Sequence, residues 1–276
     1  MTPALQQHLQ AWLQEDLGRG DLSAAALQGC RGQAHWLSKA DGVFCGGQLA
    51  AAVFGLMDSG VTAQVLVNDG DAISAGTRLL ELEGPAAALV GAERTALNLA
   101  MRLSGIATAT AALASQLQGT GVQLVDTRKT TPGLRVLEKY AVRCGGGSNH
   151  RMGLDDAAML KENHIAWAGG ITAAIQAVRQ RSPWPARVIV EAETEAQASE
   201  AVQAGADGVL LDEFTPEQLV ELVPRLRHQS PAGVVLEASG VQPEQLRAYA
   251  ATGIDLISTS APVTRSRWLD LSMRFS

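Results

Sequence analysis

The stretch VIVEAETEAQASEAVQAGADGVLLD, residues 188–212, decides the fold class. It begins and ends with a short apolar run, and the segment between the two runs has the boundaries of a helix. Thr194 and Gln197 have the spacing of an N-terminal capping box, and Gly205 stands where a left-handed C-terminal cap is expected. Apolar runs without alternation are typical of strands that are buried on both faces. This stretch therefore predicts a parallel sheet covered by helices.

The same rhythm of strand, loop and helix extends over the chain from residue 121 onward. Six short apolar runs each end on a polar or ionisable residue, namely Asp126, Lys161, Glu191, Asp212, Glu237 and Ser258. In a parallel α/β barrel such strand ends share one rim, where active sites of this architecture form. Solvated loops explain one or two polar ends, but five of these six residues are ionisable.

The first hundred residues have a different pattern. A helix is expected over residues 3–16, and strand-like runs at 34–37, 61–67 and 78–82 are separated by turn residues. From residue 85 to about residue 117 an Ala- and Leu-rich stretch predicts one or two packed helices. Blocks of strands followed by helices indicate an α+β arrangement.

Composition excludes several function classes. The formal net charge of −6 and the pI near 5.4 argue against general binding to nucleic acids or membranes. No apolar run is expected to span a bilayer, and the N-terminal segment lacks the pattern of a signal peptide.

Three cysteines, Cys30, Cys45 and Cys144, are an odd number without CxxC spacing. This usage predicts reduced thiols in a cytoplasmic protein, and neither a disulfide framework nor a zinc site. Cys144 lies beside a run of glycines, so a reactive thiol is conceivable there. A small buried apolar residue is the favoured interpretation.

The segment 126–153 is strongly basic within this acidic chain, with six Lys or Arg residues against two acidic residues. A local positive field of this kind favours a small anion and not a polymer. Arg offers planar forks for carboxylates and Lys a compact charge for phosphates, which singles out Arg128, Lys129 and Arg151. The remaining basic residues of this segment follow each other at intervals of four and are expected on the solvated side of a surface helix: Arg135, Lys139 and Arg143.

Three consecutive glycines, residues 145–147, precede Ser148-Asn149-His150-Arg151. Glycines permit left-handed backbone and a close approach of amides to an anion. A tight turn without any ligand is an equally good interpretation of this loop taken alone.

Taken together, DTRKTTPGLR (126–135), KYAV (139–142), CGGGSNHR (144–151) and LKENHI (160–165) closely resemble the quinolinate phosphoribosyltransferase family. The resemblance covers nearly the whole chain, through EDLGRGDLS (15–23), GVFCG (42–46), GAERTALN (91–98) and LDLSMRF (269–275). It implies an N-terminal α+β open-sandwich domain over residues 1–105 and an incomplete α/β barrel of parallel strands over residues 106–264. Residues 265–276 are then expected to return to the first domain.

The resemblance also implies an activity. Enzymes of this family transfer a phosphoribosyl group from phosphoribosyl pyrophosphate to quinolinate with loss of carbon dioxide. The products are nicotinate mononucleotide and pyrophosphate, and the reaction belongs to NAD synthesis. A Mg²⁺ cofactor, two small-molecule substrates and a homodimer with shared active sites are implied, with no nucleic acid or membrane partner.

Residue by residue, the resemblance implies that quinolinate is surrounded by Arg128, His150, Arg151 and Lys161, with Arg94 reaching the site from the neighbouring subunit. Lys129 and Thr127 are assigned to substrate binding, and Glu191 and Asp212 to the magnesium-bound pyrophosphate and ribose, through substrate or water. The catalytic set is Lys129, Lys161, Glu191 and Asp212. The 5′-phosphate is expected on backbone amides and hydroxyls of the late loops, at Ser239, Gly240, Thr259, Ser260 and Ala261.

The sequence departs from the family pattern at three positions. Glu213 replaces a common asparagine, Val241 follows a shortened glycine motif, and Ser260 stands where glycine is expected. These departures affect phosphate binding more than chemistry. Four other functions are alternatives, of which the first is the runner-up, and the second is disfavoured because its motif lacks the LEKYAV and KENH segments present here. They are a nicotinate phosphoribosyltransferase, the molybdenum-operon homologue of the family, a Schiff-base enzyme using Lys161, and a non-catalytic anion-binding protein. The first has a substrate with one carboxylate, whereas the dense cluster of Arg, His and Lys favours quinolinate.

Overall fold

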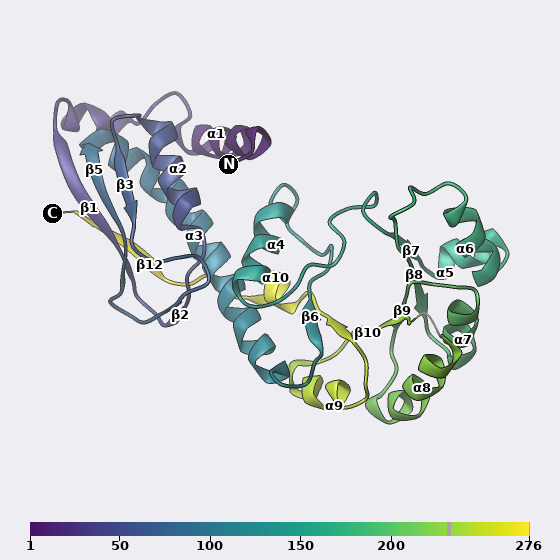
Figure 1. Ribbon diagram of the computed structural model, residues 1–276. Helices are drawn as coiled ribbons and strands as arrows, with labels where there is room; N and C mark the ends of the chain where they lie inside the picture. The colour runs from purple at the N-terminus through teal and green to yellow at the C-terminus, as the bar shows by residue number, and fades with distance from the viewer. Residues whose placement is uncertain (231–232, 276) are drawn as a thin grey trace. The chain divides into compact units, whose positions relative to one another are not determined.

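The computed structural model describes residues 1–230 and 233–275, which form two compact units (Figure 1). The first unit comprises Met1–Ala111, Tyr140–Gly146 and the segment from Arg265 onward. The second unit comprises Ala112–Lys139 and Gly147–Thr264. Each unit has its own sheet and is described by itself.

The first unit is built on a four-stranded antiparallel sheet. Its strand order is β12 (Leu271–Phe275), β1 (Arg31–Ser38), β5 (Arg78–Pro85) and β3 (Thr62–Val65). Buried and partly exposed residues alternate along the second half of β1, because one face of the sheet meets the core. Trp36 is fully buried on this face and contacts Phe54 edge to face, with ring centroids 6.2 Å apart. The strands expected in this region are confirmed.

Helices and short elements complete the first unit. The expected N-terminal helix is confirmed as α1 (Pro3–Leu17), which is followed by the 3₁₀ helix η1 (Leu22–Leu27). Helix α2 (Gly47–Met57) was not expected from the sequence, and α3 (Ala86–Ala114) begins directly after Pro85. The short strands β2 (Gly42–Val43) and β4 (Ala72–Ile73) pair antiparallel.

Helix α3 continues into the 3₁₀ helix η2 (Ser115–Leu117). Judged by length and composition alone, the two helices together could cross a membrane. The mean hydropathy of their apolar window is 1.2. This corrects the expectation that no apolar run reaches that length. Half of the apolar window is buried inside the protein, as in the core helix of a globular unit, so the criterion is weak evidence for a membrane span.

The second unit is built on a six-stranded parallel sheet. Its strands are β6 (Gln123–Val125), β7 (Ala158–Leu160), β8 (Val188–Ala192), β9 (Gly208–Leu211), β10 (Val235–Ala238) and β11 (Leu256–Ser258). They are ordered β6-β11-β10-β9-β8-β7, and every neighbouring pair is parallel. Within the described residues β6 and β7 are the two unpaired edges, apart from a single bridge between Val125 and Ser148. The predicted incomplete barrel of parallel strands is confirmed.

Helices cover the outer side of these strands, as Figure 1 shows for α6 (Ile171–Arg179), α7 (Glu195–Gln203), α8 (Pro216–Gln229) and α9 (Leu246–Ala250). The remaining elements are α4 (Arg135–Cys144), α5 (Glu162–Ala168), η3 (Pro243–Gln245) and α10 (Ala261–Arg265). Helix α7 begins at the predicted capping box, in which Thr194 and Gln197 bond each other's backbone reciprocally. Gly205 has the left-handed φ of 84° expected after this helix.

Candidate active site

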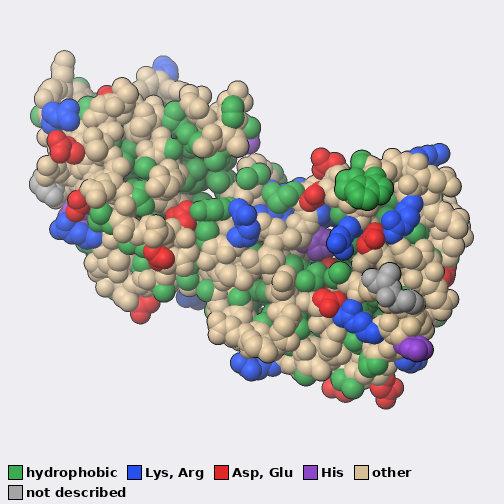
Figure 2. All heavy atoms as spheres, in the orientation of Figure 1, with side chains coloured by type: hydrophobic (Ala, Val, Ile, Leu, Met, Phe, Trp, Pro, Cys, Tyr) green, Lys and Arg blue, Asp and Glu red, His purple; other side chains and the backbone are tan. Residues whose placement is uncertain are grey.

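One cavity lies at the carboxyl ends of the parallel strands in the second unit. Its volume is about 440 Å³, and it is lined by all six strand-end residues that the sequence singles out. Figure 2 shows basic, acidic and histidine side chains close together on the face of this unit. The lining residues are Asp126, Thr127, Arg128, Lys129, His150, Arg151, Met159, Lys161, Glu191, Leu210, Asp212, Glu237, Ser239 and Ser258.

Asp126 organises one side of this cavity. Asp126 follows β6 and is 2% exposed as a whole residue, and its carboxylate accepts hydrogen bonds from three donors. The backbone N–H of His150 donates to Oδ1 at 2.8 Å, and the Asn149 side-chain amide donates to Oδ2 at 2.7 Å. Lys139 Nζ forms an ion pair with Oδ1. The loop after β6 and the segment carrying His150 are therefore held together by one carboxylate.

Lys139 is buried, which corrects its interpretation as a residue of a solvated helix face. It is 1% exposed, and its Nζ also donates to the His150 carbonyl at 2.9 Å. Burial of this ammonium is tolerated because a carboxylate and a carbonyl satisfy it. The spacing of four residues places Lys139 on the same side of α4 as Arg135 and Arg143, but it does not say what that side faces. Arg143 is exposed, whereas Arg135 donates to Thr130 Oγ1 at 3.0 Å.

Glu138, beside Lys139, is fully buried as well. Its carboxylate accepts hydrogen bonds from the Thr131 backbone N–H at 2.8 Å and from the Thr131 hydroxyl at 2.9 Å. It therefore holds the loop that follows Arg128 and Lys129. The burial of both residues could have been predicted from the sequence, because an acid at a strand end is followed by adjacent Glu and Lys residues on the next helix.

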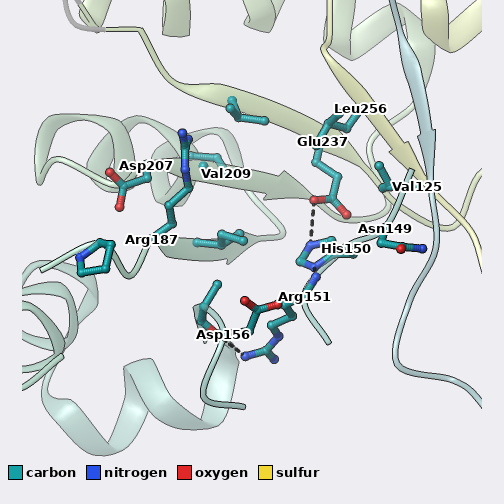
Figure 3. Close-up of a pocket in the computed structure, with 15 residues that line it drawn as sticks. Val125, Asn149, His150, Arg151, Asp156, Arg187, Asp207, Val209, Glu237 and Leu256 are labelled. Carbon is teal, nitrogen blue, oxygen red and sulfur yellow. Dashed lines mark hydrogen bonds and ion pairs between the residues drawn. The ribbon is translucent and has the colours of Figure 1, made fainter. Parts of the chain in front are cut away.

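His150 is held in one tautomer. Its Nδ1 accepts a hydrogen bond from the Arg151 backbone N–H at 2.7 Å, so Nδ1 carries no proton. The proton is therefore on Nε2, which lies 3.2 Å from Glu237 Oε2. Figure 3 shows the His150 ring and the Glu237 carboxylate pointing at each other from different segments. His150 contributes its ring to the cavity, and Glu237, 3% exposed, fixes the orientation of the ring.

A second cavity of about 380 Å³ shares His150, Arg151 and Glu237 with the first (Figure 3). It extends to residues at the beginnings of the strands, including Arg187 and Asp207. Glu237 lines both cavities, and its buried Oε1 accepts no hydrogen bond from the described residues. The interior of the open barrel is therefore polar at its centre.

Arg151 and Arg128 bring two like charges to the same cavity. Burial and, after it, the nearby Arg128 charge lower the pKa of Arg151. One guanidinium N–H of Arg151 donates to the Ala157 carbonyl at 2.7 Å, which orients the group. Two guanidinium groups that repel each other are stabilised by an anion between them.

The cavity lining contains as many acids as Lys and Arg residues, but most of the acids already have partners. Lys161 Nζ donates to Glu191 Oε2, and the Ser239 hydroxyl donates to Asp212 Oδ1. Asp126 is paired with Lys139. Among the described residues, no ion pair is formed by Arg128, Lys129 or Arg151. Three basic side chains of the cavity, Arg128, Lys129 and Arg151, are therefore available to an anionic ligand.

Some predicted residues do not line this cavity. Gly240, Thr259, Ser260 and Ala261 follow β10 and β11, close in sequence to the lining residues Ser239 and Ser258. The Ala261 backbone N–H donates to Thr259 Oγ1 at 3.2 Å. Arg94 lies exposed on α3 in the first unit.

The three departures from the family pattern have different structural settings. Glu213 is the one non-glycine residue with a positive φ, 60°, in the described chain. Asparagine tolerates this conformation better than glutamate, which gives a physical reason for the asparagine common in the family pattern. Val241 is 6% exposed and packs in the core of the second unit. Ser260 does not require left-handed backbone.

Comparison with known proteins agrees with this geometry. Residues 21–104 match the family model for the N-terminal domain of quinolinate phosphoribosyl transferase, and residues 106–274 match the model for its C-terminal domain. A probable nicotinate-nucleotide pyrophosphorylase (carboxylating) from Synechocystis sp. is 47% identical over 268 residues, covering 96% of this chain and 90% of that protein.

Solved structures show the same likeness. The nicotinate-nucleotide pyrophosphorylase from Francisella tularensis has a TM-score of 0.94 at 35% identity, covering 100% of this chain and 98% of that chain. Human nicotinic acid phosphoribosyltransferase has a TM-score of 0.65 at 16% identity and covers 100% and 74% of the two chains, a likeness of fold alone. Because two family models match most of its length, the chain belongs to the quinolinate phosphoribosyltransferase family.

Proposed function

We propose that this protein transfers the phosphoribosyl group of phosphoribosyl pyrophosphate to quinolinate, with release of pyrophosphate and carbon dioxide, to form nicotinate mononucleotide. The observation that carries the proposal is the set of unpaired basic residues, Arg128, Lys129 and Arg151, in the cavity at the strand ends. Family membership supports the same reaction, since relatives of this chain are named nicotinate-nucleotide pyrophosphorylase (carboxylating).

Quinolinate has two adjacent carboxylates on a pyridine ring, and the cavity offers two guanidinium groups. Arg128 and Arg151 provide planar forks, each of which can hold one carboxylate through two hydrogen bonds. The ring of His150 lines the same cavity as Arg151. This arrangement favours a dicarboxylate over nicotinate, which would leave one fork unsatisfied.

The other charged residues of the cavity are assigned to phosphoribosyl pyrophosphate. Lys129 supplies an unpaired ammonium for phosphate, and Glu191 and Asp212 present carboxylate oxygens at the ends of neighbouring strands β8 and β9. Hard oxygen ligands of this kind, completed by phosphate oxygens, fit Mg²⁺. Glu191 and Asp212 would hold the cation through substrate or water, and the bound cation would neutralise charge on the pyrophosphate.

The reaction requires the protein to position the two substrates and does not require a covalent bond between substrate and protein. The bond between ribose and pyrophosphate breaks, and the pyridine nitrogen attacks the resulting oxocarbenium-like carbon from the opposite face. Forks on the carboxylates orient that nitrogen, while Lys129 stabilises the departing charge. The 2-carboxylate then leaves as carbon dioxide because the cationic pyridinium ring accepts the electron pair. No general base is needed for the attack.

The 5′-phosphate is assigned to the loops after β10 and β11, at Ser239, Gly240, Thr259, Ser260 and Ala261. Gly240 has a φ of 73°, a conformation that lets backbone amides approach a ligand closely. The Thr259 and Ser260 hydroxyls offer further donors in the loop after β11. Ser260, where the family pattern has glycine, supplies an additional hydroxyl.

The proposed active unit is a homodimer in which Arg94 reaches the partner's quinolinate site. Exposure of Arg94 on α3 agrees with such a role. A closed twofold arrangement makes the contact reciprocal, so that each chain completes the other's site. The cytoplasm is the proposed location, because all three cysteines are free thiols and a reducing compartment keeps them so.

A coupled assay for nicotinate mononucleotide tests the proposal, with quinolinate or nicotinate as acceptor and with or without Mg²⁺. We expect turnover of quinolinate that depends on phosphoribosyl pyrophosphate and stops when the cation is chelated. Turnover of nicotinate alone would instead indicate a nicotinate phosphoribosyltransferase. Tight binding of both substrates without any turnover would indicate a non-catalytic binding protein.

The Schiff-base alternative is weakened by the setting of Lys161. Its Nζ is engaged by Glu191 as an ammonium group, whereas imine formation needs a free amine. Borohydride with a carbonyl substrate should therefore leave Lys161 unmodified.

A further inference from the structure

Two of the three cysteines lie together in the first unit, although 98 residues separate them in the sequence. Cys45 follows β2, and Cys144 is the last residue of α4. Their sulfur atoms and one Asp69 carboxylate oxygen all lie within 4.8 Å of one another. Cys45 is fully buried and Cys144 is partly exposed. This pair plays no part in the proposed transfer reaction.

The surroundings of the two thiols are rigid. The buried hydroxyl of Ser104 accepts from the Cys45 N–H at 2.9 Å and donates to the Cys45 carbonyl at 3.1 Å. On the other side, Gly145 packs so closely on α3 that an added Cβ would lie 2.3 Å from the Ala107 carbonyl oxygen. The backbones of both cysteines are therefore fixed by their neighbours, and the nearness of the sulfurs follows from the fold.

The two sulfurs are chemically unequal. The Cys45 thiol, through its hydrogen bond, lowers the pKa of Cys144 most, against an opposing contribution from burial. The Tyr140 hydroxyl and the Arg143 charge lower it further, while the Asp69 charge raises it. The same hydrogen bond and burial raise the pKa of Cys45. A partly exposed thiol whose pKa is lowered, beside a buried thiol whose pKa is raised, is the arrangement of an attacking and a resolving cysteine.

We propose that Cys45 and Cys144 form a peroxide-sensitive dithiol that closes to an intramolecular disulfide. The Cys144 thiolate attacks hydrogen peroxide, so that an S–O bond forms, the O–O bond breaks, and hydroxide leaves and takes up a proton as water. The Cys45 sulfur then attacks the sulfenic acid, the S–O bond breaks, and the departing hydroxide takes the Cys45 proton to give a second water. Two thiols and one peroxide thus become one disulfide and two waters.

A metal site is the competing use of the same side chains, and the hydrogen bonds of Asp69 argue against it. Its Oδ1 accepts from the backbone N–H groups of Gly46 and Gly47, both at 2.9 Å. Its Oδ2 accepts from the Tyr140 hydroxyl at 2.8 Å. A carboxylate with three donors already in place has little capacity left for a cation, whereas a disulfide needs the two sulfurs alone.

The test is a thiol count on the full-length protein after exposure to hydrogen peroxide, followed by denaturation. The free thiols should fall from three to one, and peptide mapping without reductant should show Cys45 joined to Cys144. The exposed Cys30 provides a matched control, because Cys30→Ser should retain the same bridge and lose both remaining thiols. In Cys45→Ser, a dimedone-type reagent should trap sulfenic acid on Cys144.

A second measurement does not depend on a core substitution. Because its pKa is lowered, Cys144 should be alkylated by iodoacetamide at pH 7 faster than a free cysteine, whose pKa is about 8.5. Tyr140→Phe removes one of the groups that lower this pKa. The alkylation rate of Cys144 should then fall at pH 7 and be unchanged at pH 10.

Three results would overturn the proposal. One is retention of all three thiols in peroxide, and another is a bridge that joins Cys30 of two chains and leaves Cys45 and Cys144 reduced. The third is one equivalent of Zn²⁺ bound to the untreated protein and lost in Cys144→Ser, which would make the cluster a metal site.

Discussion

Lys139 and Asp126 form an ion pair in which each side chain is 1% exposed, and Asp126 lines the cavity at the strand ends. Asp126 receives two further hydrogen bonds, from Asn149 and from the His150 backbone. Lys139 also donates to the His150 carbonyl. The pair thus joins three segments that are separate in the sequence and holds His150 and Arg151 in place.

Breaking this pair should destabilise the protein strongly. Lys139→Met leaves a buried carboxylate without its cation, and we expect a loss of about 3–5 kcal/mol in the free energy of unfolding. Urea denaturation at pH 7.5 measures it. Arg143→Met, on the exposed part of the same helix, should change stability by no more than about 1 kcal/mol. Equal effects of the two substitutions would show that the pair does not hold the site together.

Glu213 should be a removable source of backbone strain. It is exposed and has a φ of 60°, so Glu213→Asn should stabilise the protein by about 0.5–1 kcal/mol. Glu213→Ala removes the same charge but keeps a side chain disfavoured at this φ, and it should give little or none of the gain. Thermal unfolding of both variants separates the backbone effect from the charge effect, and equal gains would assign the effect to charge.

Arg151 should be needed as a fork and not only as a charge. Arg151→Lys keeps the positive charge but loses planar, bidentate recognition of a carboxylate, so kcat/KM for quinolinate should fall by about 100-fold. Arg143→Lys, an exposed substitution of the same type, is the control and should be near wild type. If Arg151→Lys also retains wild-type efficiency, Arg151 does not clamp a carboxylate.

Shared active sites predict complementation between two inactive variants. Arg94→Ala and Lys129→Ala homodimers should each be nearly inactive. After reversible dissociation and mixing, half of the dimers should be mixed, and each should have one intact site of two. Activity should then recover to about a quarter of wild type. A mixture that stays inactive despite verified subunit exchange would place Arg94 within its own chain's site or outside any site.

The parallel sheet could be predicted from the sequence because each strand is a local apolar run whose end lies at the rim of the barrel. The six residues from Asp126 to Ser258 meet in one cavity for this reason. Helix α2 was missed because its sequence, GQLAAAVFGLM, is apolar on nearly all sides and lacks the period of an amphipathic helix.

Partnerships between distant residues could not be predicted in the same way. The spacing of the basic residues predicts which side of the helix Lys139 occupies. The burial of the Lys139 side chain depends on Asp126, thirteen residues earlier. The pairing of His150 with Glu237 depends on β10, a strand that comes much later in the sequence. The nearness of Cys45 and Cys144 required Tyr140–Gly146 to fold into the first unit, which no local pattern contains.

Carbon dioxide release from labelled quinolinate tests the central claim most directly. Quinolinate carrying ¹³C in its 2-carboxylate is incubated with phosphoribosyl pyrophosphate and Mg²⁺, and labelled carbon dioxide and nicotinate mononucleotide are measured together. We predict one labelled carbon dioxide per nucleotide formed, none without phosphoribosyl pyrophosphate, and none when the label is in the 3-carboxylate. Nucleotide formation from nicotinate with no carbon dioxide released from quinolinate would contradict the proposed function.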